Sequence, residues 1–482
     1  MKISFVSFEV SPFVKVGGLA DVAGALPKYL KKLGEECYVI MPFHKNIEDN
    51  FDTSKFEIVK KDLVPDSHKY KAPFSVYKSF LPGSDVKIYF LKTKGLFDSE
   101  NIYEEENIFL KTSYFSDIAL KTIKEIEPDT NIVHVNDWHT SLIPVYLKTS
   151  YFEDKALGKL STLLTIHNIG YQGVFAPEFI FQAGLPGYLF NIDALEFYGK
   201  VNVLKGGLMF SDIINTVSPT YAKEIQTCEY GYGLEGILKI RSEDLYGVIN
   251  GIDYNIYNPE TDPHIFYPIR TYEDKLNNKI KLQEYLGLPI KKYSTLISFI
   301  GRLFDQKGLD LISNVINYLL LADVQLVMLG TGDKKYERFL ISLEDSFPEK
   351  VSINIKFDVD LAQKIYAGSD IFLMPSRYEP CGLGQMYAMR YGTIPVVRYT
   401  GGLVDTVQEY DSETKKGTGF GFYDYNETDL LYTILKATYY NQKKEEEWKI
   451  IFKNCMQADF SYEKTAKSYV ELYKKAIAKK FN

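Results

Sequence analysis

The sequence predicts an α/β protein made of two doubly wound domains, each with a mostly parallel sheet covered by helices. Two observations support this. Short apolar runs alternate with helical segments, and the alternation restarts cleanly after residue 290. The length of 482 residues also exceeds what one ordinary hydrophobic core accommodates. Between the two series, residues 253–268 are rich in Asn, Pro, Tyr and Asp, which predicts an irregular connection.

The first series begins with an apolar strand at 2–8, followed by a glycine-containing loop. A helical stretch then runs from Leu19 to Leu33, Gly34 ends it, and a strand at 37–41 completes a βαβ unit. Continuous apolar runs of this kind are typical of parallel strands buried on both faces. The later strands of this half are expected at 86–91, 132–136, 161–166, 211–217 and 245–250.

The second series is more regular than the first. Its strands are expected at 295–300, 324–329, 351–357, 370–375 and 393–398, and its helices at 308–321, 333–345, 359–367, 382–391 and 402–409. Apolar residues at helical spacing then predict an amphipathic docking helix within 462–481. The predicted division is therefore 1–252 for the N-terminal domain, 253–460 for the C-terminal domain and 461–482 for the last helix.

Composition excludes several classes of protein. The net charge of −7, with basic runs that are short and mixed with acids, gives no reason to expect a nucleic-acid partner. Polar residues interrupt the most apolar stretch, 311–330, which argues against a membrane span. The first strand runs into Glu9 without a signal-type cleavage region. The four cysteines are scattered, with no CxxC pair, which favours a reducing, cytoplasmic location over a disulfide scaffold or a zinc site.

The loop after the first strand contains Lys15, Gly17 and Gly18. Adjacent glycines at the start of a helix let a ligand approach the backbone N–H groups, and a lysine adds positive charge for a phosphate. A tight turn with a surface lysine is an equal alternative. The spacing of Gly17, Gly18 and Gly24 does not match GxGxxG, so a nicotinamide dinucleotide fingerprint is not supported.

Two successive strand ends in the first half carry His134, Asp137, His139 and His167. The chain has only six histidines, so their concentration here is informative. A metal site has no support from an HExxH pair or a cysteine ligand. Hydrogen bonding to a hydroxyl-rich substrate is the favoured interpretation. A structural role remains open for His134, which lies inside its strand.

Three loops of the second half are expected at one edge of the sheet. Arg302 and Lys307 flank the first loop before a helix, a setting suited to a diphosphate leaving group, although a pair of surface cations is the alternative. Glu379 lies in the second loop, where the N–H groups of Gly382 and Leu383 can hold a phosphate. The third loop, 398–403, repeats this arrangement. Together they predict a nucleotide-diphosphate pocket.

Two aspartate motifs have a simpler explanation than ligand binding. Asp358-Val359-Asp360 matches the DxD pattern that binds divalent metal in one class of sugar transferases, but it directly precedes a predicted helix. Asp333 also precedes one. Aspartate is a preferred helix N-cap, so capping is the expected role of both motifs.

Taken in order, the motifs resemble those of the bacterial glycogen synthases and plant starch synthases, which are retaining GT-B glucosyltransferases that use ADP-glucose. The resemblance covers nearly the whole chain, and the order of the motifs makes it specific. The matching segments are 15–19, 137–139, 165–168, 229–236, 250–253, 301–302, 306–308, 379–383 and 400–403. It implies two Rossmann-like doubly wound domains facing each other across a cleft, with the last helix returning to the N-terminal domain.

The resemblance also implies a reaction, in which glucose moves from ADP-glucose to the non-reducing-end 4-hydroxyl of an α-1,4-glucan with retention. The catalytic residues it implies are Glu379, His167, Asp137, Arg302 and Lys307. The substrate-binding residues it implies are Lys15, Gly17, Gly18, Asp21, Asn250, Phe357, Cys381, Gly382, Leu383, Thr400 and Gly401. Neither a metal nor another cofactor is required on this interpretation, because cations and helix N-termini supply the positive charge.

Three alternatives remain. A related GT-B enzyme could use UDP-glucose or another acceptor, but many such relatives have a second glutamate where this chain has Tyr387. A catalytically silent glucan-binding protein is disfavoured by the complete set of implied catalytic residues. An NAD-dependent oxidoreductase is disfavoured by the missing GxGxxG. One departure from the family, Asn136 in place of a common histidine, leaves the local hydrogen bonding to be determined.

Overall fold

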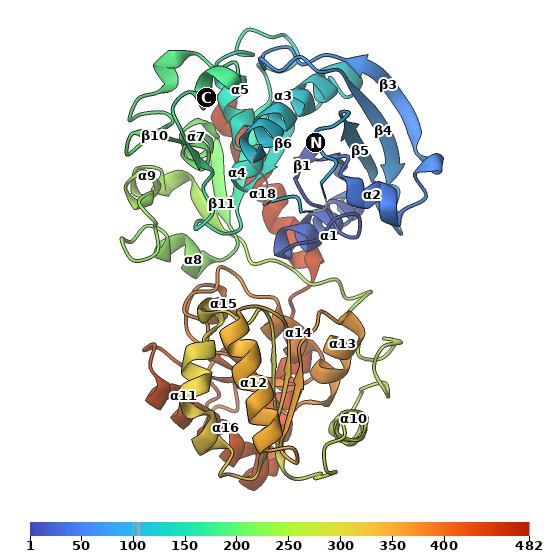
Figure 1. Cartoon of the computed structure of the whole chain (residues 1–482), viewed down its shortest axis with the longest axis vertical. Coiled ribbons are helices and arrows are strands. Elements are labelled where there is room, and N and C mark those ends of the chain that lie inside the picture. Colours follow the sequence, from blue (N-terminus) through green and yellow to red (C-terminus); the bar gives the residue numbers. More distant parts are fainter. Residues whose placement is uncertain (100, 104–106, 482) are drawn as a thin grey trace. The chain divides into compact units, whose positions relative to one another are not determined.

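The computed structural model describes residues 1–99, 101–103 and 107–481. The chain forms two compact units, Met1–Gly251 together with the segment from Tyr462 onward, and Ile252–Ser461. Each unit has its own sheet of mainly parallel strands covered by helices (Figure 1), which confirms the predicted fold class. The chain therefore passes between the units twice, once after Gly251 and once after Ser461.

Within the described residues, the large sheet of the N-terminal unit has nine strands in the order β12-β11-β7-β6-β1-β2-β5-β4-β3. These are β1 (Lys2–Val6), β2 (Glu36–Pro42), β3 (Glu57–Leu63), β4 (Phe74–Phe80), β5 (Lys87–Lys92), β6 (Ile132–Asn136), β7 (Ser161–Ile166), β11 (Ile213–Thr216) and β12 (Leu245–Gly247). Pairing is parallel from β12 to β5 and antiparallel among β5, β4 and β3. The antiparallel strands β3 and β4 were not predicted. Most of β3 is exposed, so it has no continuous apolar run to reveal it.

Helices and a small sheet complete this unit. The helices are α1 (Gly18–Lys32), α2 (Lys45–Asn50), α3 (Ile108–Ile126), α4 (Asp137–Thr140), α5 (Leu142–Lys148), α6 (Phe179–Gln182), α7 (Val203–Phe210), α8 (Pro219–Glu224), α9 (Glu235–Ile240) and α18 (Tyr462–Phe481). The small sheet has the order β8-β10-β9, with β8 (Val174–Phe175), β9 (Glu196–Phe197) and β10 (Lys200–Asn202). No helix in the described part of the chain is both long enough and apolar enough to cross a membrane.

The C-terminal unit has a fully parallel sheet, in the order β15-β14-β13-β16-β17-β18. Its strands are β13 (Thr295–Ile300), β14 (Val324–Leu329), β15 (Val351–Asn354), β16 (Ile371–Met374), β17 (Ile394–Arg398) and β18 (Phe420–Phe422). Its helices are α10 (Tyr272–Tyr285), α11 (Leu309–Leu319), α12 (Lys334–Ser346), α13 (Val359–Gly368), α14 (Gly384–Arg390), α15 (Gly402–Thr406), α16 (Glu427–Lys443) and α17 (Glu445–Gln457). The sequence-based prediction did not include α10, β18, α16 and α17. It placed the start of α14 two residues too early and the end of β15 at residue 357.

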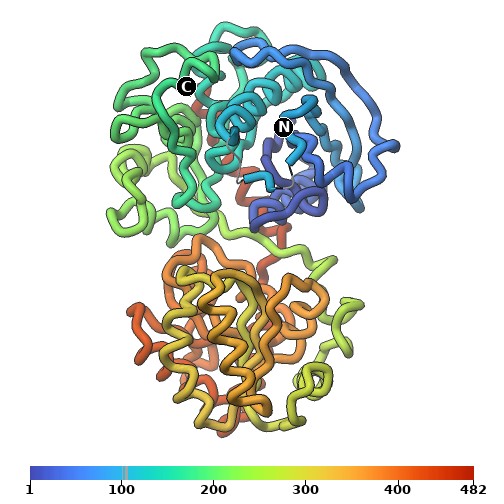
Figure 2. Tube along the Cα trace, in the orientation of Figure 1, coloured from blue at the N-terminus to red at the C-terminus, as the bar shows by residue number. Residues whose placement is uncertain are grey.

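The last helix, α18, belongs to the N-terminal unit, as the red end of the trace in Figure 2 shows. Two of its buried tyrosines, Tyr469 and Tyr473, contact side chains of the sheet. The Tyr473 hydroxyl lies 2.8 Å from Nδ1 of His134, and the Tyr469 hydroxyl accepts a hydrogen bond of 3.0 Å from Asn215. The other ring nitrogen of His134 lies 2.8 Å from the Thr165 hydroxyl. Both nitrogens of His134 are therefore used to hold the helix and a neighbouring strand, which is the structural role left open for this residue.

Candidate active site

Apart from Asn250, the candidate site residues of the N-terminal unit follow β1, β6 and β7, which are neighbours in the sheet. All three strands are parallel, so their carboxyl ends lie at one edge. The loop after β1 leads to Lys15, β6 leads to Asp137, and β7 leads to His167. Ligands of doubly wound sheets bind at this edge, as the sequence predicted for these loops.

The loop after β1 is held by Glu9, a residue to which the sequence analysis gave no role in the site. Its Oε2 accepts hydrogen bonds from the backbone N–H groups of Val16 at 2.6 Å and Gly17 at 3.2 Å. Glu9 is only 3% exposed. Burial raises the pKa of Glu9 to about 7, although the two N–H donors favour the charged form and lower it. A single glutamate after a strand has no spacing signal, so only the folded loop reveals it.

The start of α1 combines a cation with two glycines. The Lys15 amino group lies 2.7 Å from Oδ1 of Asp21 in the first turn of the helix. Burial raises the pKa of Asp21, and the adjacent Lys15 opposes that rise. Gly17 is the N-cap and Gly18 the first helical residue, and no side chain caps the helix. This leaves the helix start suited to an anion, which is one of the two interpretations that the sequence left open.

Asp137 directly follows β6 in a left-handed backbone conformation, with φ of 52°. Its Oδ1 accepts a hydrogen bond of 2.7 Å from the backbone N–H of His167. Burial raises the pKa of Asp137 to about 7, the two backbone N–H donors from His167 and Asn168 lower it, and the negative charge of Glu9 raises it further. The carboxyl groups of Asp137 and Glu9 are therefore electrostatically coupled at the sheet edge.

The hydrogen bonds around His167 determine which of its ring nitrogens has the proton. The Asn136 amide donates to the carbonyl oxygen of Val6 at 3.0 Å, so the amide oxygen of Asn136 must face the other way. That oxygen lies 3.0 Å from Nε2 of His167 and can only accept. Burial lowers the pKa of His167 to about 3, so the ring is neutral at pH 7. Nε2 is thus protonated, and Nδ1 is an acceptor for a hydroxyl group.

His139 has a different environment from His167. Its ring stacks on Phe8 with centroids 5.4 Å apart, and it also contacts the rings of Tyr103 and Trp138. Burial lowers the pKa of His139 to about 3. Nδ1 of His139 is buried without a hydrogen-bond partner in the part of the chain that the structure describes, as is Oδ1 of Asn250. Across the described ranges, no group of three or more His, Cys, Asp or Glu side chains is arranged to hold a metal ion.

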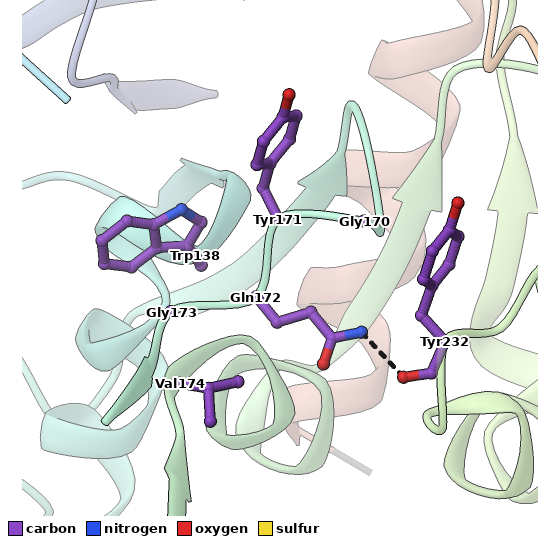
Figure 3. A pocket seen from close by; sticks show the side chains of 7 residues that line it. All are labelled: Trp138, Gly170, Tyr171, Gln172, Gly173, Val174 and Tyr232. Atoms are coloured by element: carbon purple, nitrogen blue, oxygen red, sulfur yellow. Dashed lines mark hydrogen bonds between the residues drawn. The ribbon is translucent and has the colours of Figure 1, made fainter. Parts of the chain in front are cut away.

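An open pocket of about 400 Å³ lies next to these residues (Figure 3). It is lined by Trp138, Gly170, Tyr171, Gln172, Gly173, Val174 and Tyr232. The Gln172 amide donates to the carbonyl oxygen of Tyr232 at 3.1 Å and accepts from Asn202 at 2.7 Å, which joins the two loops of the pocket. The sequence gave these residues no role, although Trp138 and Tyr232 lie in the motifs that showed the family resemblance.

In the C-terminal unit, the central contact joins Lys307 to Glu379. The Lys307 amino group lies 2.5 Å from Oε2 of Glu379, and the Ser376 hydroxyl donates to the same oxygen at 3.0 Å. Glu379 is 6% exposed. Arg302, in the same loop as Lys307, is exposed, and its guanidinium lies 6.0 Å from the centre of the Phe304 ring. Strands β13 and β16 are adjacent, which brings these loops together.

Two glycines allow the loops of this unit to interlock. Gly308 has φ of 77°, and a Cβ there would lie 2.2 Å from the carbonyl oxygen of Pro375. Gly401 has φ of 47°, and a Cβ there would lie 2.0 Å from the carbonyl oxygen of Glu379. Any side chain would separate the loops. Glycine at both positions therefore keeps Lys307 in contact with Glu379.

The predicted phosphate-binding segment lies beside this contact. Cys381 and Thr400 are buried, Gly382 has φ of 72°, and Leu383 is the N-cap of α14. The prediction that the helix opens at residue 382 is wrong, because Gly382 is left-handed and cannot be the first helical residue. The N–H groups of Gly382 and Leu383 lie in the turn that precedes α14.

Two further predicted residues occupy contrasting environments. Asn250, in the segment after β12, is 5% exposed, and its Oδ1 is buried without a hydrogen-bond partner among the described residues. A buried polar oxygen without a partner is costly, which supports a ligand contact there. Phe357 follows β15 and is 81% exposed, so its ring is available to a ligand.

The two aspartate motifs are helix caps, as predicted. The Asp358 side chain accepts a hydrogen bond of 2.9 Å from the N–H of Leu361, and Asp333 accepts one of 3.0 Å from Lys335. Asp360 lies 2.8 Å from Nδ1 of His264 and also pairs with Lys364. The carboxylates of the DxD pattern are thus engaged in capping and ion pairs.

Comparison with known proteins gives the same family over the whole chain. The family profile described as the starch synthase catalytic domain matches residues 2–240, and the profile of glycosyl transferases group 1 matches residues 287–451. The glycogen synthase of Petrotoga mobilis is 72% identical over 480 residues, covering 100% of this chain and 99% of that protein. The chain belongs to the glycogen and starch synthase family. The glycogen synthase of Thermotoga maritima is 55% identical and covers 99% of each chain.

A solved structure of this family shares the fold. The catalytic domain of starch synthase IV from Arabidopsis thaliana, bound to ADP and acarbose, has a TM-score of 0.90 and 32% sequence identity, and covers 99% of each chain. The GT-B fold expected for glycogen and starch synthases is thereby confirmed. The predicted site residues are divided between the two units. The N-terminal group is Lys15, Gly17, Gly18, Asp21, Asp137, His167 and Asn250, and the C-terminal group is Arg302, Lys307, Phe357, Glu379, Cys381, Gly382, Leu383, Thr400 and Gly401.

Proposed function

We propose that this chain is a glycogen synthase, which transfers glucose from ADP-glucose to the non-reducing-end 4-hydroxyl of an α-1,4-glucan with retention of configuration. The contact between Lys307 and Glu379 is the observation that carries the proposal, because it places a cation and a carboxylate together at the sheet edge where ligands bind. The identity of 72% to a glycogen synthase supports the reaction, and the ADP bound to starch synthase IV supports an adenine nucleotide donor.

The charges of the C-terminal group suit the departure of ADP. As the bond between the anomeric carbon and the diphosphate oxygen breaks, its electron pair leaves with ADP, and negative charge grows on the phosphate. Arg302 and Lys307 stabilise that charge. The anomeric carbon becomes positive at the same time, and the carboxylate of Glu379 stabilises it. Lys15 is proposed as a further phosphate contact. These cations supply the charge that a metal would otherwise supply, so no metal or other cofactor is part of the proposal.

The polar groups of the N-terminal unit suit a sugar. His167 offers a neutral Nδ1, and Asn250 offers a buried oxygen without a partner in the described part of the chain. Both are acceptors for sugar hydroxyl groups. Asp137 is held by two backbone N–H groups, and we assign it to the same hydroxyl-binding set. The new bond forms between the acceptor 4-oxygen and the anomeric carbon, and the hydroxyl proton is released.

The pocket beside Trp138 is proposed as the binding site for the glucan acceptor. Aromatic rings of Trp138, Tyr171 and Tyr232 line it, and such rings pack against the apolar faces of sugar rings. The Gln172 amide donates to Tyr232 and accepts from Asn202, so it fixes the shape of the pocket.

The deciding experiment measures ADP release from ADP-glucose with glycogen present, beside UDP-glucose and a control without acceptor. We expect strong release that requires both ADP-glucose and glycogen. Release with UDP-glucose alone would keep the reaction type and change the donor. No release with either donor would favour a silent glucan-binding protein or a different acceptor.

A further inference from the structure

A tyrosine at the tip of the β9–β10 hairpin is strongly exposed in a strained conformation. Tyr198 is 82% exposed and has φ of 50°, and Gly199 beside it has φ of 75°. These are the two central residues of a two-residue turn that needs left-handed backbone at both positions. Asn, Asp or Gly normally fills the first position, because a bulky side chain there costs free energy. The hairpin thus retains an unfavourable tyrosine whose ring faces water.

The pocket contains a second example of the same pairing. Tyr232 has φ of 51° and is followed by Gly233 with φ of 85°. Tyr232 is 47% exposed and lines the pocket (Figure 3). Strained residues concentrate where a protein uses them. Two tyrosines of the N-terminal unit therefore have an unfavourable left-handed backbone conformation and an accessible ring.

The two tyrosine turns are in contact. A Cβ placed on Gly233 would lie 2.9 Å from Cζ of Phe197 and 3.6 Å from Cε2 of Tyr198, so both rings lie against this glycine. The Phe197 and Tyr198 rings meet edge to face, with centroids 4.7 Å apart. The Tyr198 ring thus packs against Phe197, next to the turn that contains Tyr232.

The hairpin is also joined to the pocket through the small sheet. Strand β10 pairs with β8, where Asn202 lies opposite the pocket residue Val174. Asn202 also donates to Gln172, the residue that links the pocket loops. The exposed ring of Tyr198 therefore lies next to the turn that contains the pocket residue Tyr232.

We propose that Tyr198 forms an outer subsite for the glucan, in which its ring stacks on a glucose unit of an acceptor chain that extends out of the pocket past Tyr232. The proposal rests on the acceptor assignment of the proposed function. A pyranose ring has an apolar C–H face that packs on an aromatic ring, while its hydroxyl groups stay in water. A tyrosine at a wet surface suits this ligand because its own hydroxyl also remains solvated.

The proposal predicts a dependence on acceptor length. Tyr198→Ala is expected to lower kcat/KM for maltoheptaose and glycogen by roughly fivefold, as for the loss of one aromatic contact. The values for maltotriose and the KM for ADP-glucose should stay unchanged, because a short acceptor does not reach the ring. Tyr198→Phe should keep the wild-type values, since it retains the ring. Phe152→Ala removes another exposed ring of the same unit, at 63% exposure, and should behave as the wild type.

A binding assay separates this proposal from the reaction itself. Native gels that contain glycogen slow the migration of a protein that binds it, without any turnover. We expect glycogen to slow Tyr198→Ala less than it slows the wild type. The control Phe152→Ala should be slowed as much as the wild type. Equal kinetics for short and long acceptors, with unchanged retardation, would overturn the subsite. If Tyr198→Ala changes the oligomeric state but not the dependence on acceptor length, the ring belongs to a contact between copies of the chain. That result would also overturn the subsite. Failure of the wild type to release ADP with any acceptor would instead defeat the proposed function, and the gel result would still decide the subsite.

Discussion

The amino group of Lys307 lies 2.5 Å from Oε2 of Glu379, and the same carboxylate oxygen accepts a hydrogen bond from Ser376. Two side chains from two adjacent loops therefore fix one carboxylate oxygen. The side chain of Glu379 is 8% exposed and that of Lys307 is 20% exposed, so water screens the pair only weakly. A carboxylate held in this way keeps one position, which suits a group that must meet a developing positive charge.

Glu379→Gln is expected to remove most of the turnover while the fold survives, because an amide matches the shape of the carboxylate without its charge. The check is kcat with ADP-glucose and glycogen, beside a circular dichroism melt. Near-normal kcat in this variant would defeat the assignment of Glu379 as the essential acid.

Lys307→Ala is expected to lower kcat by about 100-fold at saturating donor, because the cation stabilises charge that grows on the departing diphosphate. Lys281→Ala is the matched control, since Lys281 forms an exposed ion pair with Glu284 on α10. It should keep wild-type kinetics. Wild-type kcat in Lys307→Ala would contradict a role for this lysine in the departure of ADP.

Gly308→Ala tests whether loop contact positions Lys307. The new Cβ would meet both a left-handed backbone and the Pro375 carbonyl, so we expect a loss of about 2 kcal/mol in the free energy of unfolding and reduced kcat. Gly287→Ala is the control, because Gly287 has φ of 72° with no atom within 4 Å of the added Cβ. It should cost about 1 kcal/mol and leave kcat unchanged. Equal effects of both variants on kcat would rule out the loop contact as the cause.

The parallel strands could be predicted from the sequence because burial on both faces makes each of them a continuous apolar run. Strand β3 could not, because it lies at the edge of the sheet and most of its residues face water. Strand β18 has only three residues, too few for a periodic pattern. Helix α16 has a detectable signal, since Asn426 caps it by accepting from Asp429, but the sequence analysis did not use that signal.

The candidate site shows a similar division. Lys15, Arg302 and Lys307 were found because glycine-rich loops mark them in the sequence. The carboxylate of Glu9 was missed because its importance comes from hydrogen bonds to Val16 and Gly17, which exist only once the loop folds back.

The tautomer of His167 can be tested by changing its partner. Asn136→Leu removes the oxygen that accepts the hydrogen bond from Nε2–H of His167. The ring is then expected to populate both neutral tautomers, and kcat should fall. The measurement is nitrogen NMR of labelled histidine in the wild type and the variant. In the wild type we expect a single neutral form with protonated Nε2 that does not titrate between pH 8 and 5, because burial lowers the pKa of His167 to about 3. Protonated Nδ1 in the wild type would overturn the assignment.

The stability of the protein should depend on pH through Glu9. Burial raises the pKa of Glu9 from its ordinary value of 4.5 to about 7, so the folded state binds a proton more tightly than the unfolded state. Stability from this group is therefore fully present below pH 4.5 and is lost as pH rises towards 7. Glu9→Gln cannot ionise and keeps an acceptor oxygen for Val16 and Gly17.

Urea unfolding of Glu9→Gln and the wild type at pH 5 to 8 measures this difference. We expect the variant to gain stability relative to the wild type as pH rises, with most of the change complete near pH 7. Asp137 adds a second decline of the same sign, because its pKa is also raised to about 7. The negative charge of Glu9 contributes to that rise, so the difference between the two proteins reports Glu9 together with its coupling to Asp137. The surface variant Glu153→Gln should follow the wild type. A constant difference across this range would show that Glu9 does not change its ionisation between the folded and unfolded states.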